Sequence, residues 1–198
     1  MHDYAIFGHD RVAIGRWLGT AAVIGASGIA QVIAYAQALT GWEVLGVTVS
    51  AGVLYFCLHW LFNKFLWKIK YFDIPDLNGQ WEITGRTLDE EGKTRFDWSG
   101  EVGITQDWKQ ILVHLKTPTS QSWSYTATLL KRNSPIGGWL LTYSYTNDPE
   151  VEANHELNGH KGYCEAEISK DLKSAKVRYF NHSGRNTFGV IDMKRRGG

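Results

Sequence analysis

The chain has almost no cysteine, since its 198 residues include only Cys57 and Cys164. Cys57 lies in a long apolar run and Cys164 in the more polar remainder, so the two thiols sit in different media and a disulfide framework is excluded. Motifs of catalysis are missing as well: there is no P-loop, no GxGxxG after a predicted strand, no GxSxG elbow and no paired-cysteine metal site. We therefore predict no enzyme activity, no cofactor and no metal.

Charge is missing from two stretches near the start of the chain. Residues 17–42 contain no charged side chain, and after a single acid the run 44–62 contains none either. A helix of about 20 residues crosses the ~30 Å hydrocarbon core of a bilayer. These runs predict two transmembrane helices, at about 17–39 and 44–62, within an N-terminal region 1–72. A cleaved signal peptide is the rival interpretation of the first run, but that run is too long and a second span follows it.

Basic residues flank the two runs and predict their orientation. Arg11 and Arg16 precede the first run, and Lys64, Lys68 and Lys70 follow the second, whereas the turn between them carries only an acid. By the positive-inside rule both termini should lie in the cytoplasm. The remaining domain, 73–198, should then be cytoplasmic too. The net charge of +1 gives no reason to expect DNA or RNA as a partner.

Small residues recur at every fourth position of the first run. They are Ala22, Ala26, Ala30, Ala34 and Ala38. Such a stripe lets another helix backbone approach closely inside a membrane. The stripe packs either on the second helix of the same chain or on neighbouring copies, and the sequence leaves both arrangements open.

From residue 73 onward the hydrophobic period changes from helical to two. Trp81 and Ile83 alternate with polar neighbours, and so do Ile111 and Val113. Turn-forming residues separate eight such segments, near 79–87, 95–105, 110–117, 122–132, 138–146, 160–168, 175–181 and 187–194. The spacing predicts an all-β domain, either a sandwich or an up-and-down barrel. A barrel of eight strands has room for side chains or for one small ligand.

The alternation also predicts which side chains face the interior. Aromatic and polar groups gather on the inward face toward one end of the strands: Tyr143, Tyr145, His160, Tyr179, Asn181 and Arg185. Rings stack on nucleobases and a guanidinium pairs with phosphate oxygens, so this set suits a flat anionic ligand. The alternative is a solid core, with tyrosines filling the interior and Arg185 in a solvated turn. On the segment 122–132, alternation places Trp123, Tyr125 and Ala127 inward.

Several short segments occur in an order and spacing that resemble one known family. They are residues 77–81 (LNGQW), 104–108 (ITQDW), the alternate serines Ser120, Ser122 and Ser124, residues 141–149 (LTYSYTNDP), 160–162 (HKG), and Tyr179-Phe180 followed by Arg185 and Gly189. With two apolar runs ahead of them, they make the chain similar to the membrane-anchored β-barrel effectors of bacterial cyclic-oligonucleotide anti-phage signalling, the CBASS systems.

The resemblance implies two transmembrane α-helices followed by an all-β, eight-stranded antiparallel up-and-down barrel, anchored in the bacterial inner membrane. It implies that the barrel binds a cyclic dinucleotide, and that the helices then self-associate, disrupt the bilayer and stop growth of the infected cell. The resemblance also implies that the alternate serines face the pocket, whereas the alternation of the strand predicts that Trp123, Tyr125 and Ala127 do. The candidate ligand-binding residues are then Ser122, Ser124, Tyr143, Tyr145, Asn147, His160, Tyr179, Asn181 and Arg185.

Two other classes of function compete with this one. A membrane-tethered barrel that resembles lipocalins would bind a small apolar ligand in a dry pocket with few cations. A purely structural anchor would have a solid barrel. The position of Arg185 relative to Tyr143 and Tyr179 distinguishes the first of these from a nucleotide receptor.

Overall fold

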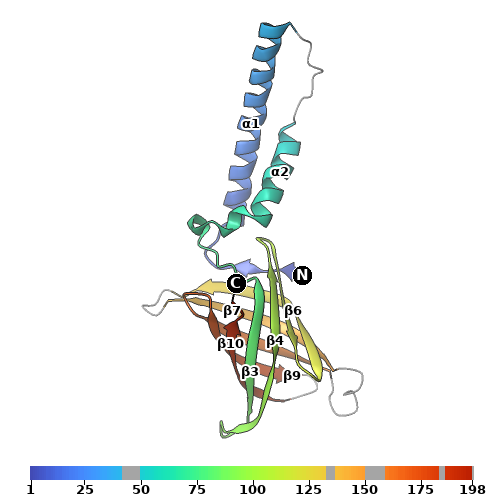
Figure 1. Cartoon of the computed structure of the whole chain (residues 1–198), viewed down its shortest axis with the longest axis vertical. Helices are drawn as coiled ribbons and strands as arrows, with labels where there is room; N and C mark the ends of the chain where they lie inside the picture. Colours follow the sequence, from blue (N-terminus) through green and yellow to red (C-terminus); the bar gives the residue numbers. More distant parts are fainter. Residues whose placement is uncertain (42–49, 133–136, 150–158, 183–185, 198) are drawn as a thin grey trace. The chain divides into compact units, whose positions relative to one another are not determined.

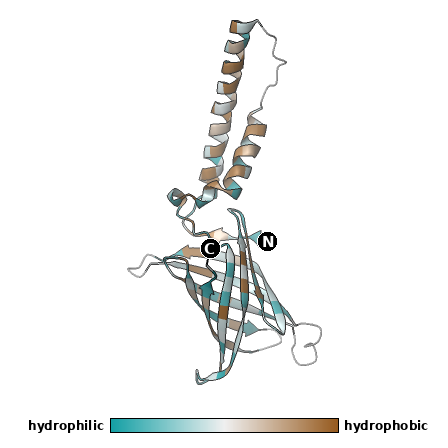
Figure 2. Cartoon of the chain, viewed as in Figure 1, coloured by the Kyte–Doolittle hydropathy of each residue, from teal (hydrophilic) through white to brown (hydrophobic). Residues whose placement is uncertain are grey.

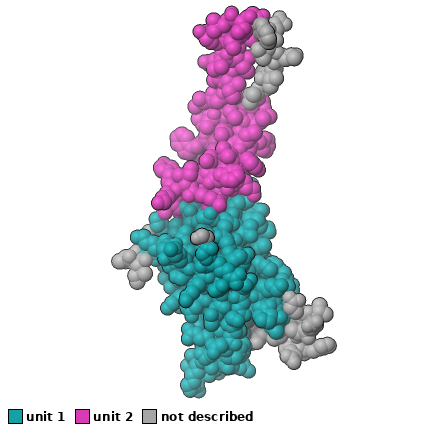
Figure 3. All heavy atoms as spheres, viewed as in Figure 1, with its two compact units in different colours: residues 1–8, 74–198 teal, residues 9–73 magenta. Residues whose placement is uncertain are grey.

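The computed structural model describes residues 1–41, 50–132, 137–149, 159–182 and 186–197. The chain forms two compact units, residues 9–73 and residues 1–8 together with 74–198 (Figure 3). Unit 9–73 holds the helices α1 (Arg11–Thr40), α2 (Ala51–Lys64), η1 (Leu66–Lys68) and η2 (Lys70–Phe72). The other unit holds β1 (His2–Asp3), β2 (Ala5–Ile6), β3 (Gly79–Leu88), β4 (Thr94–Gln106), β5 (Gln110–Lys116), β6 (Ser120–Lys131), β7 (Trp139–Pro149), β8 (His160–Ile168), β9 (Ser174–His182) and β10 (Phe188–Arg195).

Helix α1 is long and apolar, as the first run predicts. It begins after Asp10, whose carboxylate accepts a hydrogen bond of 2.9 Å from the Ala13 amide, and it ends at Gly41, whose φ of 63° suits glycine. Its 30 residues span roughly 45 Å at 1.5 Å per residue. Among the described residues it is the one helix long and apolar enough to cross a membrane (Figure 2).

Helix α2 matches only the later part of the second predicted span. It begins after Ser50, whose hydroxyl caps the Val53 amide, and it has 14 residues. At 1.5 Å per residue this is roughly 21 Å, which is less than the hydrocarbon core requires. The first positions of the predicted span 44–62 lie outside the described residues. The described structure therefore contains one membrane-length helix and one shorter apolar helix.

The small-residue stripe of α1 is used partly within the chain. Ala22 is only 1% exposed, and a Cβ placed on Gly25 would lie 2.8 Å from Cδ2 of Leu54 in α2. Close packing of the two helices therefore depends on small side chains in this half of α1. Farther along, Ala30, Ala34 and Ala38 are exposed, so no described residue covers this half of the stripe.

Eight antiparallel strands close into a barrel (Figure 1), which confirms the prediction of the fold and rules out a sandwich. Each strand from β3 to β10 pairs with the next along the chain, and β10 returns to β3 through eight paired residues from Phe188–Leu88 to Arg195–Trp81. The predicted strand limits agree with the observed ones within a few residues. Alternating burial along β3, β7, β8 and β9 confirms the predicted inward faces.

The first residues of the chain add two short strands that sequence reasoning did not predict. β5 and β6 pair only through His114–Lys116 and Gln121–Trp123. Beyond that point β1 pairs with β5 and β2 pairs in parallel with β6. Residues 1–8, which the sequence analysis grouped with the helices, therefore lie in the barrel wall. A strand of two residues has no alternation to detect, which explains why the pattern did not predict it.

A bulge in β6 corrects the predicted inward face of that strand. Pairing with β7 shifts register between Ser124 and Thr126, so Tyr125 is the extra residue and the alternation changes sign there. Ser122 and Ser124 are buried, whereas Trp123 and Tyr125 face outward; Ala127 faces inward as predicted. The prediction was wrong for Trp123 and Tyr125 because it carried one alternation through the bulge.

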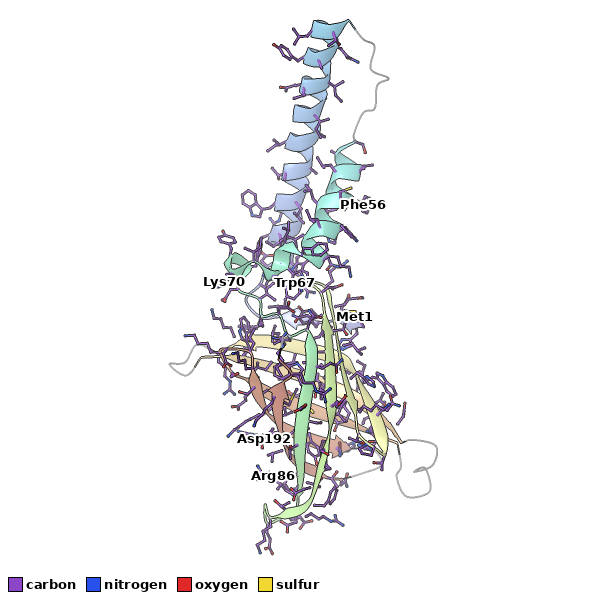
Figure 4. All side chains as sticks on the ribbon, in the orientation of Figure 1. Met1, Phe56, Trp67, Lys70, Arg86 and Asp192 are labelled. Atoms are coloured by element: carbon purple, nitrogen blue, oxygen red, sulfur yellow. The ribbon has the colours of Figure 1, made fainter. Side chains whose placement is uncertain are left out.

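One half of the barrel is filled by a tight apolar core. Trp81, Ile104, Val113, Leu141 and Met193 surround a void of only about 10 Å³. The outer face is charged, with Arg86 of β3 and Asp192 of β10 forming an ion pair of 3.6 Å (Figure 4). The core fixes the strands and so leaves the other half of the barrel to hold the site.

Candidate ligand-binding site

The other half of the barrel is hollow. A cavity of about 400 Å³ lies where β3, β5, β7 and β9 end and the following strands begin. Small-molecule sites usually enclose roughly 300–1,000 Å³. We call this cavity the cup. Because it is present, the tyrosines do not fill the interior, and the solid-core alternative is excluded.

Three aromatic rings of the cup lie over glycines of the neighbouring strand. The cross-strand pairs are Trp98 with Gly85, Tyr145 with Gly162 and Tyr179 with Gly189. A Cβ placed on Gly162 would lie 2.3 Å from Cζ of Tyr145, and one placed on Gly85 would lie 2.2 Å from the Trp98 ring. Only glycine leaves room for a ring to lie against the wall. The three rings are therefore packed against the wall of the cup, and aromatic side chains in such a position can stack on a base.

Hydrogen bonds hold the far ends of the two tyrosines. The Tyr145 hydroxyl donates to Oδ1 of Asn181, and Nδ2 of Asn181 donates to Oγ1 of Thr187 at 2.7 Å. The hydroxyls of Tyr179 and Thr87 share a hydrogen bond of 2.7 Å. Each tyrosine thus starts on one strand, crosses a glycine on the next and is tied beyond it. The rings are therefore oriented before any ligand arrives, which lowers the entropic cost of binding.

The side of the cup facing these rings carries small polar groups. Oγ1 of Thr117 accepts from the Ser120 amide at 3.0 Å, and Nδ2 of Asn147 donates to Oγ of Ser120 at 3.3 Å. Ser122 is 7% exposed and lines the cup, and its hydroxyl has no hydrogen bond to any residue that the structure describes. A buried hydroxyl usually has a partner. The Ser122 hydroxyl is therefore suited to bind a polar group inside the cup.

Positive charge is sparse in the described part of the lining. His160 is the one lining side chain there that can become cationic, and its ring meets that of Tyr145 edge-on at 6.5 Å. Neutral hydroxyls and amides supply the other donors. Arg185, the predicted guanidinium, lies outside the described residues. In the described chain no group of three His, Cys, Asp or Glu side chains is placed to hold a metal ion.

Tyr143 and Cys164 form the floor where the cup meets the apolar core. They are paired across β7 and β8, and both are buried. Burial raises the pKa of Tyr143 well above its usual value, and the neighbouring Cys164 adds to this. Burial also raises the pKa of the Cys164 thiol to about 12, against a small opposing effect of its hydrogen bond with Tyr143. Both groups are therefore neutral hydrogen-bonding groups at physiological pH.

The Cys164 thiol should react slowly with maleimide in the folded protein. A pKa of about 12 in place of 9.0 lowers the thiolate population at pH 8 by roughly a thousandfold, and the thiolate is the reacting form. Mass spectrometry of a Cys57→Ser variant would follow labelling with and without guanidinium chloride. Labelling of Cys164 at the same rate in both conditions would contradict the burial and the raised pKa.

The structure brings together seven of the nine residues predicted for the site. They are Ser122, Tyr143, Tyr145, Asn147, His160, Tyr179 and Asn181, all of which line the cup. Ser124 is buried but does not line it, because its hydroxyl accepts from the Val113 amide at 2.9 Å and lies 2.8 Å from Nε2 of His2. The ninth, Arg185, falls on undescribed residues.

Sequence reasoning missed the contribution of the first strands to the cup. Thr87, Phe96 and Trp98 line it from β3 and β4, and the turn Thr117–Ser120 lines it from the side of β5 and β6. Phe96 and Trp98 are two positions apart in β4 and therefore share one face of that strand. A second signal was the glycine opposite each ring, but it becomes visible only once the register of the strands is known.

Two family models match the chain. The model described as the Cap15 cyclic dinucleotide receptor domain matches residues 72–195, and the model described as the Cap15 TM helices matches residues 12–68. A curated relative from Yersinia aleksiciae, CD-NTase-associated protein 15, is 38% identical over 151 residues, which cover 74% of this chain and 70% of the relative. The first match contains the whole cup, and the second contains α2 and all of α1 except its first residue.

Proposed function

Because this chain belongs to the Cap15 family of cyclic dinucleotide receptors with transmembrane helices, we propose that it is the membrane-disrupting effector of a CBASS system. It binds a cyclic dinucleotide in the cup, oligomerises through its helices in the bacterial inner membrane, and breaches that membrane. The outcome is growth arrest or death of the infected cell. The curated relative is named for its association with a CD-NTase, and an enzyme of that kind is the proposed source of the messenger.

The observation that carries the proposal is the cup itself, with rings on one side and small donors on the other. Stacking on an aromatic side chain is worth about 1–3 kcal/mol per base, so two bases contribute about 2–6 kcal/mol. Micromolar affinity requires about 8 kcal/mol. Hydrogen bonds to the phosphates and base edges supply the difference. An apolar carrier would have no need for this many polar groups.

We assign the roles in the cup by position. Tyr145 and Tyr179 stack on the bases, and Asn181 fixes Tyr145 while sharing the rim with His160. The hydroxyl of Ser122 and the amide of Asn147 donate to phosphate or base edges. Tyr143 offers a neutral hydroxyl at the floor, Ser124 supports the wall behind Ser122, and Arg185 pairs with a phosphate.

The membrane topology is also part of the proposal. Helix α1 supplies one span, and the second span is proposed over 44–62, which overlaps α2 over residues 51–62. Basic residues precede the first span and follow the second, so both termini and the barrel are placed in the cytoplasm. The exposed Ala30, Ala34 and Ala38 are proposed to contact helices of neighbouring copies.

Activation then needs a difference in ligand affinity between the dispersed and the assembled chain. A ligand shifts an equilibrium only by that difference, and moving a population from 1:99 to 99:1 takes about 5.5 kcal/mol. Assembly sums the contributions of several occupied barrels. Confinement to the plane of the membrane also raises the effective concentration of the helices.

Calorimetric titration of the full chain in detergent micelles tests the function directly. The titrants are a panel of cyclic dinucleotides, with purine and pyrimidine bases and different linkages, and a matched linear dinucleotide as control. We expect micromolar or tighter binding of at least one cyclic compound and weaker binding of the linear one, which must lose more entropy on binding. Binding of a fatty acid, with no heat from any dinucleotide, would instead support the lipocalin-like carrier.

A further inference from the structure

The barrel wall has a seam between β5 and β6. The two strands pair over three residues, His114–Trp123, Leu115–Ser122 and Lys116–Gln121, and then separate. Where they separate, the Val113 amide donates to the side chain of Ser124 instead of to a backbone carbonyl. Strand edges with unpaired backbone groups attract another strand. The seam is therefore a site for strand addition built into the barrel wall.

Residues 2–6 of the same chain occupy the seam, and we call them the strap. His2 and Asp3 pair with Ile111 and Gln110 of β5, and at the other end of the strap Ala5 and Ile6 pair with Thr128 and Leu129 of β6. The strap thus crosses from one edge of the seam to the other.

Side chains anchor the strap as well as its backbone. Tyr4 is 3% exposed, its hydroxyl donates to the Asp107 carbonyl at 3.2 Å, and it accepts from Nε2 of Gln106 at 3.0 Å. Ile6 is buried too. The Nδ1 atom of His2 lies 3.0 Å from the Asp3 carbonyl, and its Nε2 atom lies 2.8 Å from the Ser124 hydroxyl.

The strap is linked to the cup through β6 and to the first helix through the chain. Ser124, which bonds His2, is two positions from Ser122 of the cup on the same strand, and Ser120 of the cup is two positions farther. In the other direction, only His9 and Asp10 separate the barrel residues 1–8 from α1, and Asp10 caps that helix. The strap is therefore linked to the cup through β6 and is followed in the chain by α1.

We propose that the strap and the ligand stabilise each other through β6, so that an occupied cup holds the residues that precede α1 in the chain. This proposal rests on the proposed function. An empty seam leaves the edges of β5 and β6 mobile, and a ligand held by Ser120 and Ser122 must then order them itself. A docked strap has already ordered the edges of β5 and β6, so binding of the ligand costs less conformational entropy of the protein. By thermodynamic reciprocity the ligand tightens the strap by the same factor, and such factors are typically about 5–150.

A pair of matched variants of the full chain tests the coupling. Ile6→Asp places a charge in a buried position and should release the strap, whereas Phe7→Asp changes the adjacent side chain, which is 73% exposed. The probe is whichever cyclic dinucleotide gives the largest heat with the unmodified chain. We expect Ile6→Asp to weaken its binding at least fivefold and Phe7→Asp to leave it unchanged.

Two further measurements do not depend on the folding of Ile6→Asp. Asp3→Cys and Gln110→Cys, at positions paired across β1 and β5, should form a disulfide that locks the strap in a Cys57→Ser background. We expect the oxidised form to bind the probe more tightly than the reduced form. Hydrogen exchange of residues 2–6 in the unmodified chain should slow when the probe is bound.

The outcomes separate this proposal from the proposed function. Equal affinity of the oxidised and reduced forms, with exchange of the strap unchanged by the probe, overturns the coupling and leaves the receptor function intact. An unmodified chain that binds none of the cyclic dinucleotides overturns both.

Discussion

Replacing Tyr145 with alanine should weaken binding of the cyclic dinucleotide by about 10-fold to 100-fold while the barrel stays folded. Loss of a stacked ring costs about 1–3 kcal/mol, and 1.4 kcal/mol corresponds to tenfold in affinity. The hydrogen bond to Asn181 disappears with the ring, so that side chain also becomes free to rotate away from Thr187. Calorimetric titration measures the affinity, and circular dichroism on heating reports the fold.

Matched variants separate the ring from its hydroxyl and from general destabilisation. Tyr145→Phe keeps the ring and loses the bond to Asn181, so we expect a smaller loss of affinity. Gly162→Ala introduces a Cβ where the Tyr145 ring lies, but leaves the tyrosine itself unchanged. We expect it to weaken binding about as much as Tyr145→Ala does. Tyr163→Ala removes a ring that is 39% exposed on the outer face of β8 and should change nothing. Unchanged affinity in Tyr145→Ala would show that the ring is not a stacking platform.

The barrel could be predicted from sequence because its signals are local. Eight segments alternate apolar and polar residues, and turn residues separate them, so the number of strands and most inward faces follow from neighbouring residues alone. The alternation of β7 and β8 placed Tyr143, Tyr145 and His160 correctly inside the barrel. A bulge is different, because the inserted residue Tyr125 resembles any other strand residue until the pairing with β7 is known.

The parts of the site that sequence reasoning missed depend on register and on distant pairing. The fit of Trp98 over Gly85 and of Tyr179 over Gly189 is set by which residues face each other on adjacent strands. His2 of the strap is 122 residues away from Ser124 along the chain. No local pattern reports such a contact. Only the resemblance to a known family turned Ser122 inward in agreement with the structure.

Replacing residues 9–73 with a flexible Gly/Ser linker should abolish membrane damage and preserve ligand binding. The linker removes unit 9–73 and keeps residues 1–8 with the barrel, so the strap can still fill the seam. Without α1 and α2 the occupied barrels have nothing to insert into the bilayer. Leakage of a dye from vesicles after addition of the cyclic dinucleotide measures the damage, and calorimetry on the same protein measures binding.

The full chain carrying Tyr145→Ala is the complementary control, because it keeps the helices and impairs the cup. At a ligand concentration that only partly saturates the unmodified chain, this variant should cause little leakage. A ligand concentration 10-fold to 100-fold higher should restore the leakage. The linker variant should cause none at any concentration. If a barrel without residues 9–73 still permeabilised vesicles, sensing and membrane damage would reside in the same unit. The differential affinity that drives assembly would then have to arise between barrels, not between helices.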